Sequence, residues 1–190
     1  MIKEHYEIVK KGREAIFTWR KENPSIVFDL SDADLSGADF RSIDLSGADL
    51  SDADLSGVNF SGANLVHVLF IVTNLEKANL SCTNLIYADF SYANLHGANL
   101  RDANLSGTNF NATDLIKANL SYANLHGAVL RDANLRDAIF IKANLSHADL
   151  YGADLSYADL RNADLGYADF HNAILKGTDT ENAILIGTKF

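Results

Sequence analysis

Histidine, cysteine and aspartate are the side chains of this sequence that could bind a metal ion or transfer a proton. The histidines and the single cysteine are His5, His67, His96, His126, His147, His171 and Cys82. They occur singly, without the paired spacing of a zinc site. The GGxGxD motif of calcium-binding repeats is absent. The sequence therefore predicts no metal site, no cofactor and no catalytic residues.

Length, composition and charge limit the kind of protein that this sequence can form. The 190 residues suffice for one domain, and 47% of them are hydrophobic, which excludes a disordered chain. A formal charge of −9 argues against nonspecific binding to nucleic acid or to an anionic membrane. No apolar run approaches the roughly 18 residues of a membrane span, and the charged N-terminus does not resemble a signal peptide. We expect a cytoplasmic protein, and the lone cysteine suits a reducing compartment.

The sequence repeats with a period of five. From Leu30 to Phe190, every fifth residue forms a series of 33 positions that holds 24 leucines, eight phenylalanines and Thr180. Two residues earlier, 23 of the 33 positions are alanine, and the residue between is usually Asp or Asn. This period matches neither a helix nor an ordinary strand. It predicts a solenoid whose walls each point two residues inward, with Ser-Gly and Ser-Asp pairs at the corners.

The phenylalanines indicate how many walls one coil has. All eight fall at multiples of ten, from Phe40 to Phe190, which places them on two opposite walls of a four-sided, 20-residue coil. Residues 20 apart then stack in columns, and no two histidines are expected to share such a column. An uninterrupted rod also lacks the concave pocket that an enzyme generally needs. We therefore expect a non-enzymatic protein, with Cys82 as an exposed corner residue.

Units such as ADLSG, ANLHG and ADFSY resemble the A(D/N)LXX signature of the pentapeptide repeat family over residues 28–190. The resemblance implies an all-β solenoid, a right-handed quadrilateral β-helix in which four pentapeptides make one square coil. About eight 20-residue coils, at about 4.8 Å per layer, would form a rod roughly 40 Å long.

Residues 1–24 are expected to form an N-terminal capping helix on a single β-helix domain of residues 25–190. Near-helical spacing predicts one apolar stripe on this cap, formed by Ile2, Tyr6, Val9, Ile16 and Trp19. Pro24 would end the helix. The segment GREAIFTWRKENPS also resembles a leader that often precedes such arrays in cyanobacterial proteins. Either a hydrophobic cap or a docking helix would explain this stripe.

The C-terminal coil departs from the repeat in a way that predicts a homodimer. Several of its outer positions are apolar, one inner position is threonine, and no capping helix follows the array. We expect two chains to meet end to end here, because a twofold dimer would hide such a surface. A frayed last coil is the alternative. The expected contact residues are Ile174, Thr180, Ile184, Ile186 and Phe190.

The stretch NLVHVLFIVTNL, residues 64–75, breaks the polar pattern of the outer surface. Val68 and Phe70 take ordinary inward positions, whereas their neighbours occupy positions that elsewhere hold Ser, Gly, Asp or Asn. With residues one coil later, these neighbours should form an apolar patch of about a few hundred Å². Stabilisation of outer ladders by β-branched residues is the alternative. We expect a partner or a second copy to bind Val66, His67, Leu69, Ile71, Val72, Ile86, Tyr87 and Tyr92.

Two classes of function remain. The first is a non-catalytic, rigid binding or scaffold protein with an unidentified protein partner. The second follows from the resemblance, because some family members mimic duplex DNA, bind DNA gyrase and confer fluoroquinolone resistance. The array from residue 25 carries 10 basic and 21 acidic residues. Its net charge is about half of the ~23 charges on duplex DNA of that length. It also lacks the interrupting loops and dimerising C-terminal helix typical of the resistance proteins, so we favour the first class.

Overall fold

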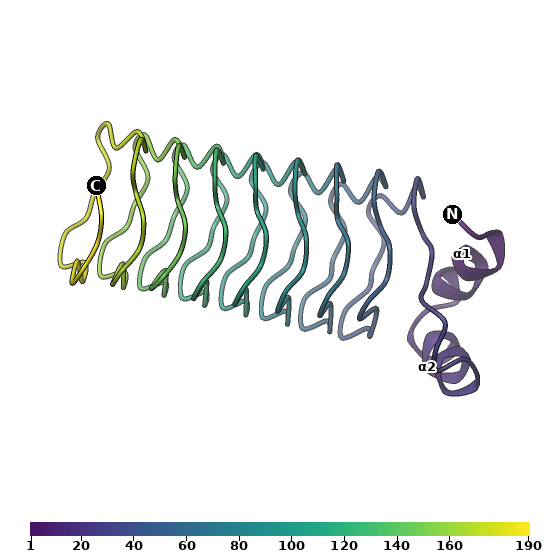
Figure 1. Ribbon diagram of the computed structural model, residues 1–190. Helices are drawn as coiled ribbons and strands as arrows, with labels where there is room; N and C mark the ends of the chain where they lie inside the picture. Colours follow the sequence, from purple (N-terminus) through teal and green to yellow (C-terminus); the bar gives the residue numbers. More distant parts are fainter.

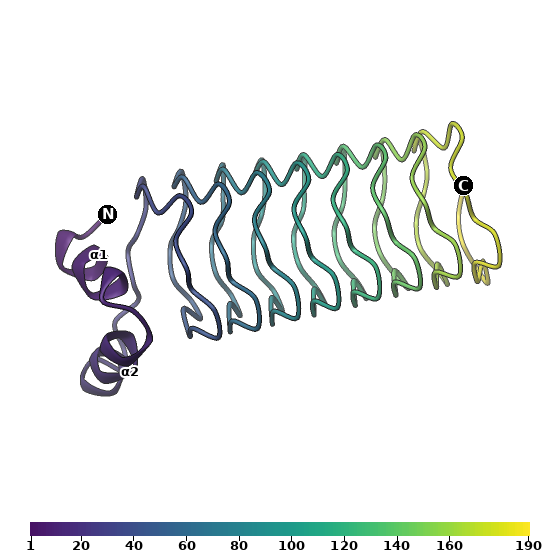
Figure 2. The same ribbon diagram turned by 180° about the vertical axis from the view of Figure 1, so that it is seen from behind.

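The computed structural model describes residues 1–190 as a rod of stacked coils with two short helices at its N-terminal end (Figure 1, Figure 2). Parallel β-bridges join residues 20 apart along the whole rod, from Asp29–Asp49 to Asp169–Lys189. One such bridge occurs every five residues. Each coil therefore contains 20 residues and four sides, as the spacing of the phenylalanines predicts.

Backbone hydrogen bonds link each coil to the next in a fixed register. The N–H of Leu30 donates to the carbonyl of Asp49 at 2.8 Å, and the N–H of Asp49 donates to the carbonyl of Phe28 at 2.8 Å. The same two bonds recur on each wall, so the inner part of the rod has no unpaired sheet edge. A column of residues 20 apart is consequently a line of direct neighbours on the surface.

The core consists of the inward Leu or Phe of each wall and the small residue two positions earlier. These residues form one continuous buried cluster that runs from the helices to Phe170. Phe90 stacks between Phe70 and Phe110, with ring centroids 4.7 and 5.0 Å away. Val68 and Phe70 are fully buried, which confirms their inward positions. Large and small side chains thus alternate around a core that leaves little space along the axis.

The N-terminal segment forms two helices, so the expectation of one helix over residues 1–24 is wrong. Helix α1 spans Lys3–Lys10 and helix α2 spans Arg13–Glu22. Gly12 separates them with φ 84°, a left-handed conformation that glycine adopts without steric cost. This turn lets both helices pack across the first coil. Neither helix is long and apolar enough to cross a membrane.

The two helices bury apolar side chains against the first coil. Val9, Ile16 and Trp19 join the core, and the Trp19 ring lies 4.2 Å from that of Phe28. Tyr6 is half-buried, whereas Ile2 is 46% exposed, so its predicted place in the apolar stripe is wrong. Ile2 precedes α1 in extended conformation, and its N–H instead donates to the carbonyl of Asp29 at 3.1 Å.

The helices also supply hydrogen bonds to first-coil groups that have no preceding coil. The Arg20 guanidinium donates to the carbonyls of Asp44 and Ser46 at 3.0 and 2.6 Å. His5, which the sequence pattern did not identify, is buried and accepts the N–H of Asp29 through Nδ1 at 2.9 Å. Burying these backbone groups without partners would be costly. The helices therefore contribute polar as well as apolar contacts.

Candidate functional site

The corners of the coils are tight turns that hold side chains away from the core. At one corner, the N–H of Ala33 donates to the carbonyl of Leu30 at 3.2 Å, and Asp32 has φ 56°. A positive φ at the third residue is typical of a type II turn. The second corner residue is left-handed throughout the array, and 22 residues other than glycine adopt this conformation. The second corner residue, where it has a side chain, thus points away from the core, whereas first corner residues such as Ser91 and Ser121 are buried.

Aspartate and asparagine on the outer walls brace these corners. The Asp34 carboxylate accepts hydrogen bonds from the Ser36 hydroxyl and backbone N–H, at 2.8 and 3.1 Å. These two bonds, the hydroxyl first, lower the pKa of Asp34. The Arg161 guanidinium, followed by its backbone N–H, lowers the pKa of Asp159 in the same way. These two carboxylates therefore stay ionised to a lower pH than a free aspartate would.

Asparagines in the middle coils also bond to one another. Asn79 donates to the side-chain oxygen of Asn59 at 3.2 Å, and Asn99 donates to that of Asn79 at 3.3 Å. Such ladders need a donor, which an ionised aspartate lacks. The change from Asp to Asn in the middle of the rod therefore exchanges surface charge for contacts between coils.

The predicted apolar patch lies on one wall and its two corners, two coils high. Leu69, Val72, Tyr87 and Tyr92 are 38, 53, 61 and 62% exposed. Val66, Ile71 and Ile86 are half-buried, and His67 is exposed. The rings of His67 and Tyr87 stack with centroids 5.4 Å apart. The structure brings all eight predicted patch residues together at the surface.

Val72 is the most strained of the four patch residues that have a left-handed backbone, since His67, Tyr87 and Tyr92 are not β-branched. Its φ is 59°, and among the 22 non-glycine residues with positive φ it is the one with a β-branched side chain. Sterics strongly disfavour β-branched residues in the left-handed region. The corresponding corner position one coil earlier is Asp52, a residue type that tolerates this conformation better. An exposed and strained valine contributes little to the fold, which supports a role in contacts.

One of the four edges of the rod carries no charge, and sequence reasoning missed it. We call it the neutral edge. It comprises the corner pairs 46–47, 66–67, 86–87, 106–107, 126–127, 146–147, 166–167 and 186–187. None of these residues is Asp, Glu, Lys or Arg, whereas each of the other three edges carries charges of both signs. Counting charges by column of 20 would have revealed it from the sequence.

The histidines lie mainly at corners, without a metal-binding arrangement. His67 and His147 are 80 residues apart and therefore occupy one column, so the expectation that no two histidines share a column is wrong. His126 lies edge-on to His147, with ring centroids 5.3 Å apart. No group of three or more His, Cys, Asp or Glu side chains could hold a metal ion. Cys82 is exposed at a corner, as predicted.

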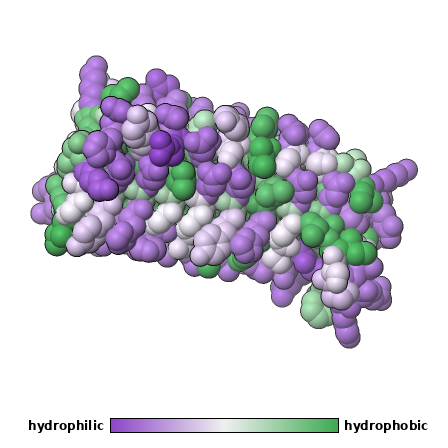
Figure 3. All heavy atoms as spheres, in the orientation of Figure 1, coloured by the Kyte–Doolittle hydropathy of each residue, from purple (hydrophilic) through white to green (hydrophobic).

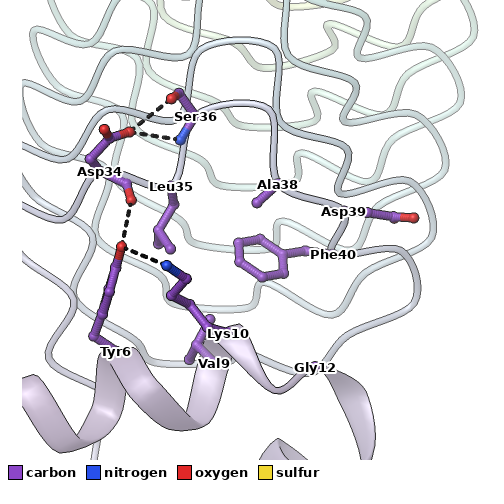
Figure 4. Close-up of a pocket in the computed structure, with 10 residues that line it drawn as sticks. All are labelled: Tyr6, Val9, Lys10, Gly12, Asp34, Leu35, Ser36, Ala38, Asp39 and Phe40. Atoms are coloured by element: carbon purple, nitrogen blue, oxygen red, sulfur yellow. Dashed lines mark hydrogen bonds between the residues drawn. The ribbon is translucent and has the colours of Figure 1, made fainter.

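A cleft of about 370 Å³ separates α1 from the first coil (Figure 4). Tyr6 donates to the carbonyl of Asp34 at 3.2 Å on one side, and Lys10 donates to the Tyr6 hydroxyl at 3.4 Å. Asp39 projects away from the cleft in this view. The cleft holds no histidine or cysteine, and its one hydroxyl–carboxylate pair, Ser36 and Asp34, is the hydrogen bond that braces a corner. It belongs to the contact between the helices and the rod.

The C-terminal coil leaves apolar side chains and backbone groups uncovered. Leu185 and Phe190, which take inward positions, are 44 and 65% exposed. Ile174, Thr180, Ile184 and Ile186 are exposed as well. The register of hydrogen bonds between coils ends with Phe170 N–H to Lys189 carbonyl, so the N–H groups of Leu185 and Phe190 have no backbone acceptor. The predicted end residues thus share one open surface.

Hydrophobic side chains on the face seen in Figure 3 occur at separate places along the rod and gather beside the helices. A second cleft, of about 380 Å³, lies where α2 meets the first coil and is lined by Phe17 and Arg20 among others. Arg20 is already engaged by the first-coil carbonyls. This region therefore serves the packing of the helices.

Comparisons with known proteins agree with this architecture. The family model described as pentapeptide repeats matches in eight copies, over residues 29–65, 63–102, 93–132, 129–166 and 163–190. No curated protein gave a significant match.

Comparison with solved structures also indicates the fold. The trypsin-treated form of QnrB1, a plasmid-mediated fluoroquinolone resistance protein, is 22% identical, with a TM-score of 0.63 over 82% of this chain and 86% of its own. HetL, a pentapeptide repeat protein involved in heterocyst differentiation regulation in Nostoc sp. strain PCC 7120, is 28% identical over 91% and 92%, with a TM-score of 0.33. The likeness to QnrB1 establishes the fold. With family matches that run from residue 29 to residue 190, this chain belongs to the pentapeptide repeat family.

Proposed function

We propose that this protein is a non-catalytic, rigid scaffold that binds a protein partner through the apolar patch. The scaffold is a right-handed β-helix of about eight coils with a helical N-terminal cap. The observation that carries the proposal is the exposed, strained Val72 within a cluster of exposed apolar and aromatic side chains. Aromatic side chains such as those of Tyr87 and Tyr92 are enriched at protein interfaces. The fully buried residues beneath the patch would hold it rigid, which lowers the entropic cost of binding.

Replacing Val66, Ile71 and Val72 together by serine should abolish capture of the partner from a native lysate. The substitutions remove the apolar contact and leave the buried wall of Val68 and Phe70 intact. Affinity capture followed by mass spectrometry would identify proteins held by the parent chain and lost by the variant. A partner bound equally by both chains would contradict the proposal.

The matched control for the patch replaces Ile116 and Ile141 by serine. Both are half-buried corner residues, as Ile71 is, and both lie outside the patch. This double variant should retain the partner. Circular dichroism of both variants should match that of the parent, because none of the replaced side chains belongs to the core.

We also propose a homodimer in which two chains meet through the C-terminal coil. The exposed apolar side chains and unpaired N–H groups of this coil support it, because a second copy related by a twofold axis would cover both. Replacing Phe190 by aspartate should convert the dimer to a monomer of 20.7 kDa, because it places two like charges in an apolar contact. Light scattering at micromolar concentration measures the mass. A parent chain that is already monomeric would contradict this proposal.

A second candidate function is mimicry of duplex DNA toward a topoisomerase such as DNA gyrase. The observation in its favour is the acidic array, which carries 10 basic and 21 acidic residues from residue 25 onward. A supercoiling assay with purified gyrase would test it. Inhibition, or protection from a quinolone, at tens of micromolar protein would favour this function. The absence of both effects would exclude it.

A further inference from the structure

The neutral edge has an order of residues that reads alike in both directions. Its second corner residues are, from the N-terminal end, Gly47, His67, Tyr87, Gly107, Gly127, His147, Tyr167 and Gly187. By class, this series is one glycine, two aromatic rings, two glycines, two aromatic rings and one glycine. Each histidine stacks on the following tyrosine, with centroids 5.4 Å apart in the first pair and 5.1 Å in the second. The edge thus carries two equivalent ring pairs around a centre of two glycines.

We propose that two copies of this chain bind side by side and antiparallel along the neutral edge, about a twofold axis between Gly107 and Gly127. A twofold axis perpendicular to the rod reverses its direction and places each column opposite itself, so an interface of this kind must be self-complementary on reversal. Tyr87 of one copy then faces His147 of the other, and His67 faces Tyr167. At the centre, Gly127 of each copy faces Gly107 of the other. A Cβ at Gly127 would meet no atom within 4 Å, whereas the Tyr87 ring lies over Gly107, so the open Gly127 leaves room for the Tyr87 ring of the other copy.

The same twofold axis also brings first corner residues of different size together, one from each copy. Val66 faces Gly166 of the other copy, and Ile86 faces Ser146, so each large apolar side chain meets a small residue. A hollow of about 320 Å³, whose lining includes Ser146, His147 and Gly166, lies at this place on the edge. The apolar side chains of one copy would enter the hollow of the other. Such fitting of large into small residues is typical of packed interfaces.

Charge points to this edge and to a second copy as its occupant. The array of each copy is strongly acidic, with 10 basic and 21 acidic residues from residue 25 onward. Two such rods repel each other, and the neutral edge is the line of approach that brings no charged corner residues together. A single edge buries less than the ~800 Å² per partner of a standard interface. We therefore expect a weak dimer that salt strengthens by screening the repulsion.

This inference rests on the binding role proposed above, because Val66 and Tyr87 belong to both the apolar patch and the neutral edge. The rest of the patch, including Ile71 and Val72, lies on the adjoining wall and corner. The lateral contact overlaps the C-terminal surface at Ile186, whereas Ile174, Thr180 and Phe190 lie outside the neutral edge. Self-association along the edge can therefore be measured separately from the other two contacts.

The test places a charge at the centre of the proposed contact. In a Phe190→Asp background, which removes association through the C-terminal coil, Gly127→Asp should weaken self-association at least about tenfold. A Cβ at Gly127 meets no atom within 4 Å, and Asp102 and Asp132 occupy equivalent corners with positive φ, so the fold should persist. Sedimentation equilibrium at moderate and high salt measures the association.

Gly57→Asp is the matched control, because its Cβ also meets no atom within 4 Å and it lies at another edge. It should leave the dimer unchanged. Mixing Gly127→Asp with Gly127→Lys copies should restore association as a heterodimer, because the two positions lie on either side of the axis, only about one 4.8 Å layer apart along the rod. Lys117 and Lys142 show that this corner conformation accepts lysine.

Three outcomes would overturn the proposal. They are a background chain that stays monomeric at high concentration and salt, equal loss with Gly57→Asp, and failure of the mixed copies to associate. A monomeric Gly127→Asp chain that still captures a protein partner through Ile71 and Val72 would separate the two proposals. In that case the patch would bind its partner without any need for the lateral dimer.

Discussion

Replacing Phe90 by alanine should destabilise the rod by about 3–5 kcal/mol. The Phe90 side chain is fully buried, and its ring stacks on Phe70 at 4.7 Å and on Phe110 at 5.0 Å. Its removal would leave a cavity between coils that cannot collapse, because the backbone hydrogen bonds on every side hold the layers apart. The two neighbouring rings would also lose their stacking contacts.

Urea unfolding followed by circular dichroism measures this effect as a lower midpoint. Phe17→Ala is the control, because Phe17 is 67% exposed and its loss should change the free energy of unfolding by less than ~0.5 kcal/mol. In a solenoid each coil contacts only its neighbours, so the loss at Phe90 should separate the unfolding of the two halves. Equal midpoints for both variants would refute the role assigned to the stacked rings.

Replacing Trp19 by alanine should release the helices from the first coil and cost about 3 kcal/mol. The Trp19 ring packs at 4.2 Å on Phe28 and edge-on at 4.9 Å against His5. Without it, α2 loses its largest buried side chain. The Arg20 bonds to the first-coil carbonyls, one exposed and one half-buried, would then lose the packed helix that positions them.

Hydrogen exchange can locate this loss, because stability in a solenoid is distributed by coil. In Trp19→Ala, the backbone amides of Leu35 and Phe40 should exchange faster, whereas that of Leu120 should keep the protection of the parent. Phe17→Ala, on the same helix, should change neither. Unaltered exchange at Leu35 and Phe40 would mean that the helices do not stabilise the first coil.

The packing of the core could be predicted from the sequence, because one physical requirement determines which residues point inward. Every wall must present a large residue and a small one to the same narrow core, so the period of five, the inward Phe70 and the 20-residue coil could all be predicted. Local breaks were harder to foresee. Gly12 divides the helical segment by its left-handed backbone. The spacing of apolar residues also does not predict that Ile2 lies in an extended segment before α1 and is exposed.

The outer surface was predictable only in part. The apolar patch stood out because Leu69 and Val72 interrupt a polar pattern, and the structure confirms their exposure. The strain at Val72 became visible only with the backbone angle of its corner. The neutral edge consists of residues that are ordinary one by one, and His5 acts through a backbone hydrogen bond that no repeat pattern encodes. Such features depend on which residues share a column or a neighbour in space.

Because the register of the coils is fixed, the position of a residue within its 20-residue coil decides which edge or wall of the rod it occupies. Inserting or deleting 20 residues would lengthen or shorten the rod by about 4.8 Å and leave every edge continuous. Inserting five residues would keep a large and a small residue pointing inward on every wall, although it would move the downstream phenylalanines onto the two walls that hold only leucine. It would nevertheless turn everything downstream by a quarter turn, so that His147 and Tyr167 would point a right angle away from His67 and Tyr87. A frame without loops thus tolerates change in length only in whole turns if its surfaces are to stay aligned.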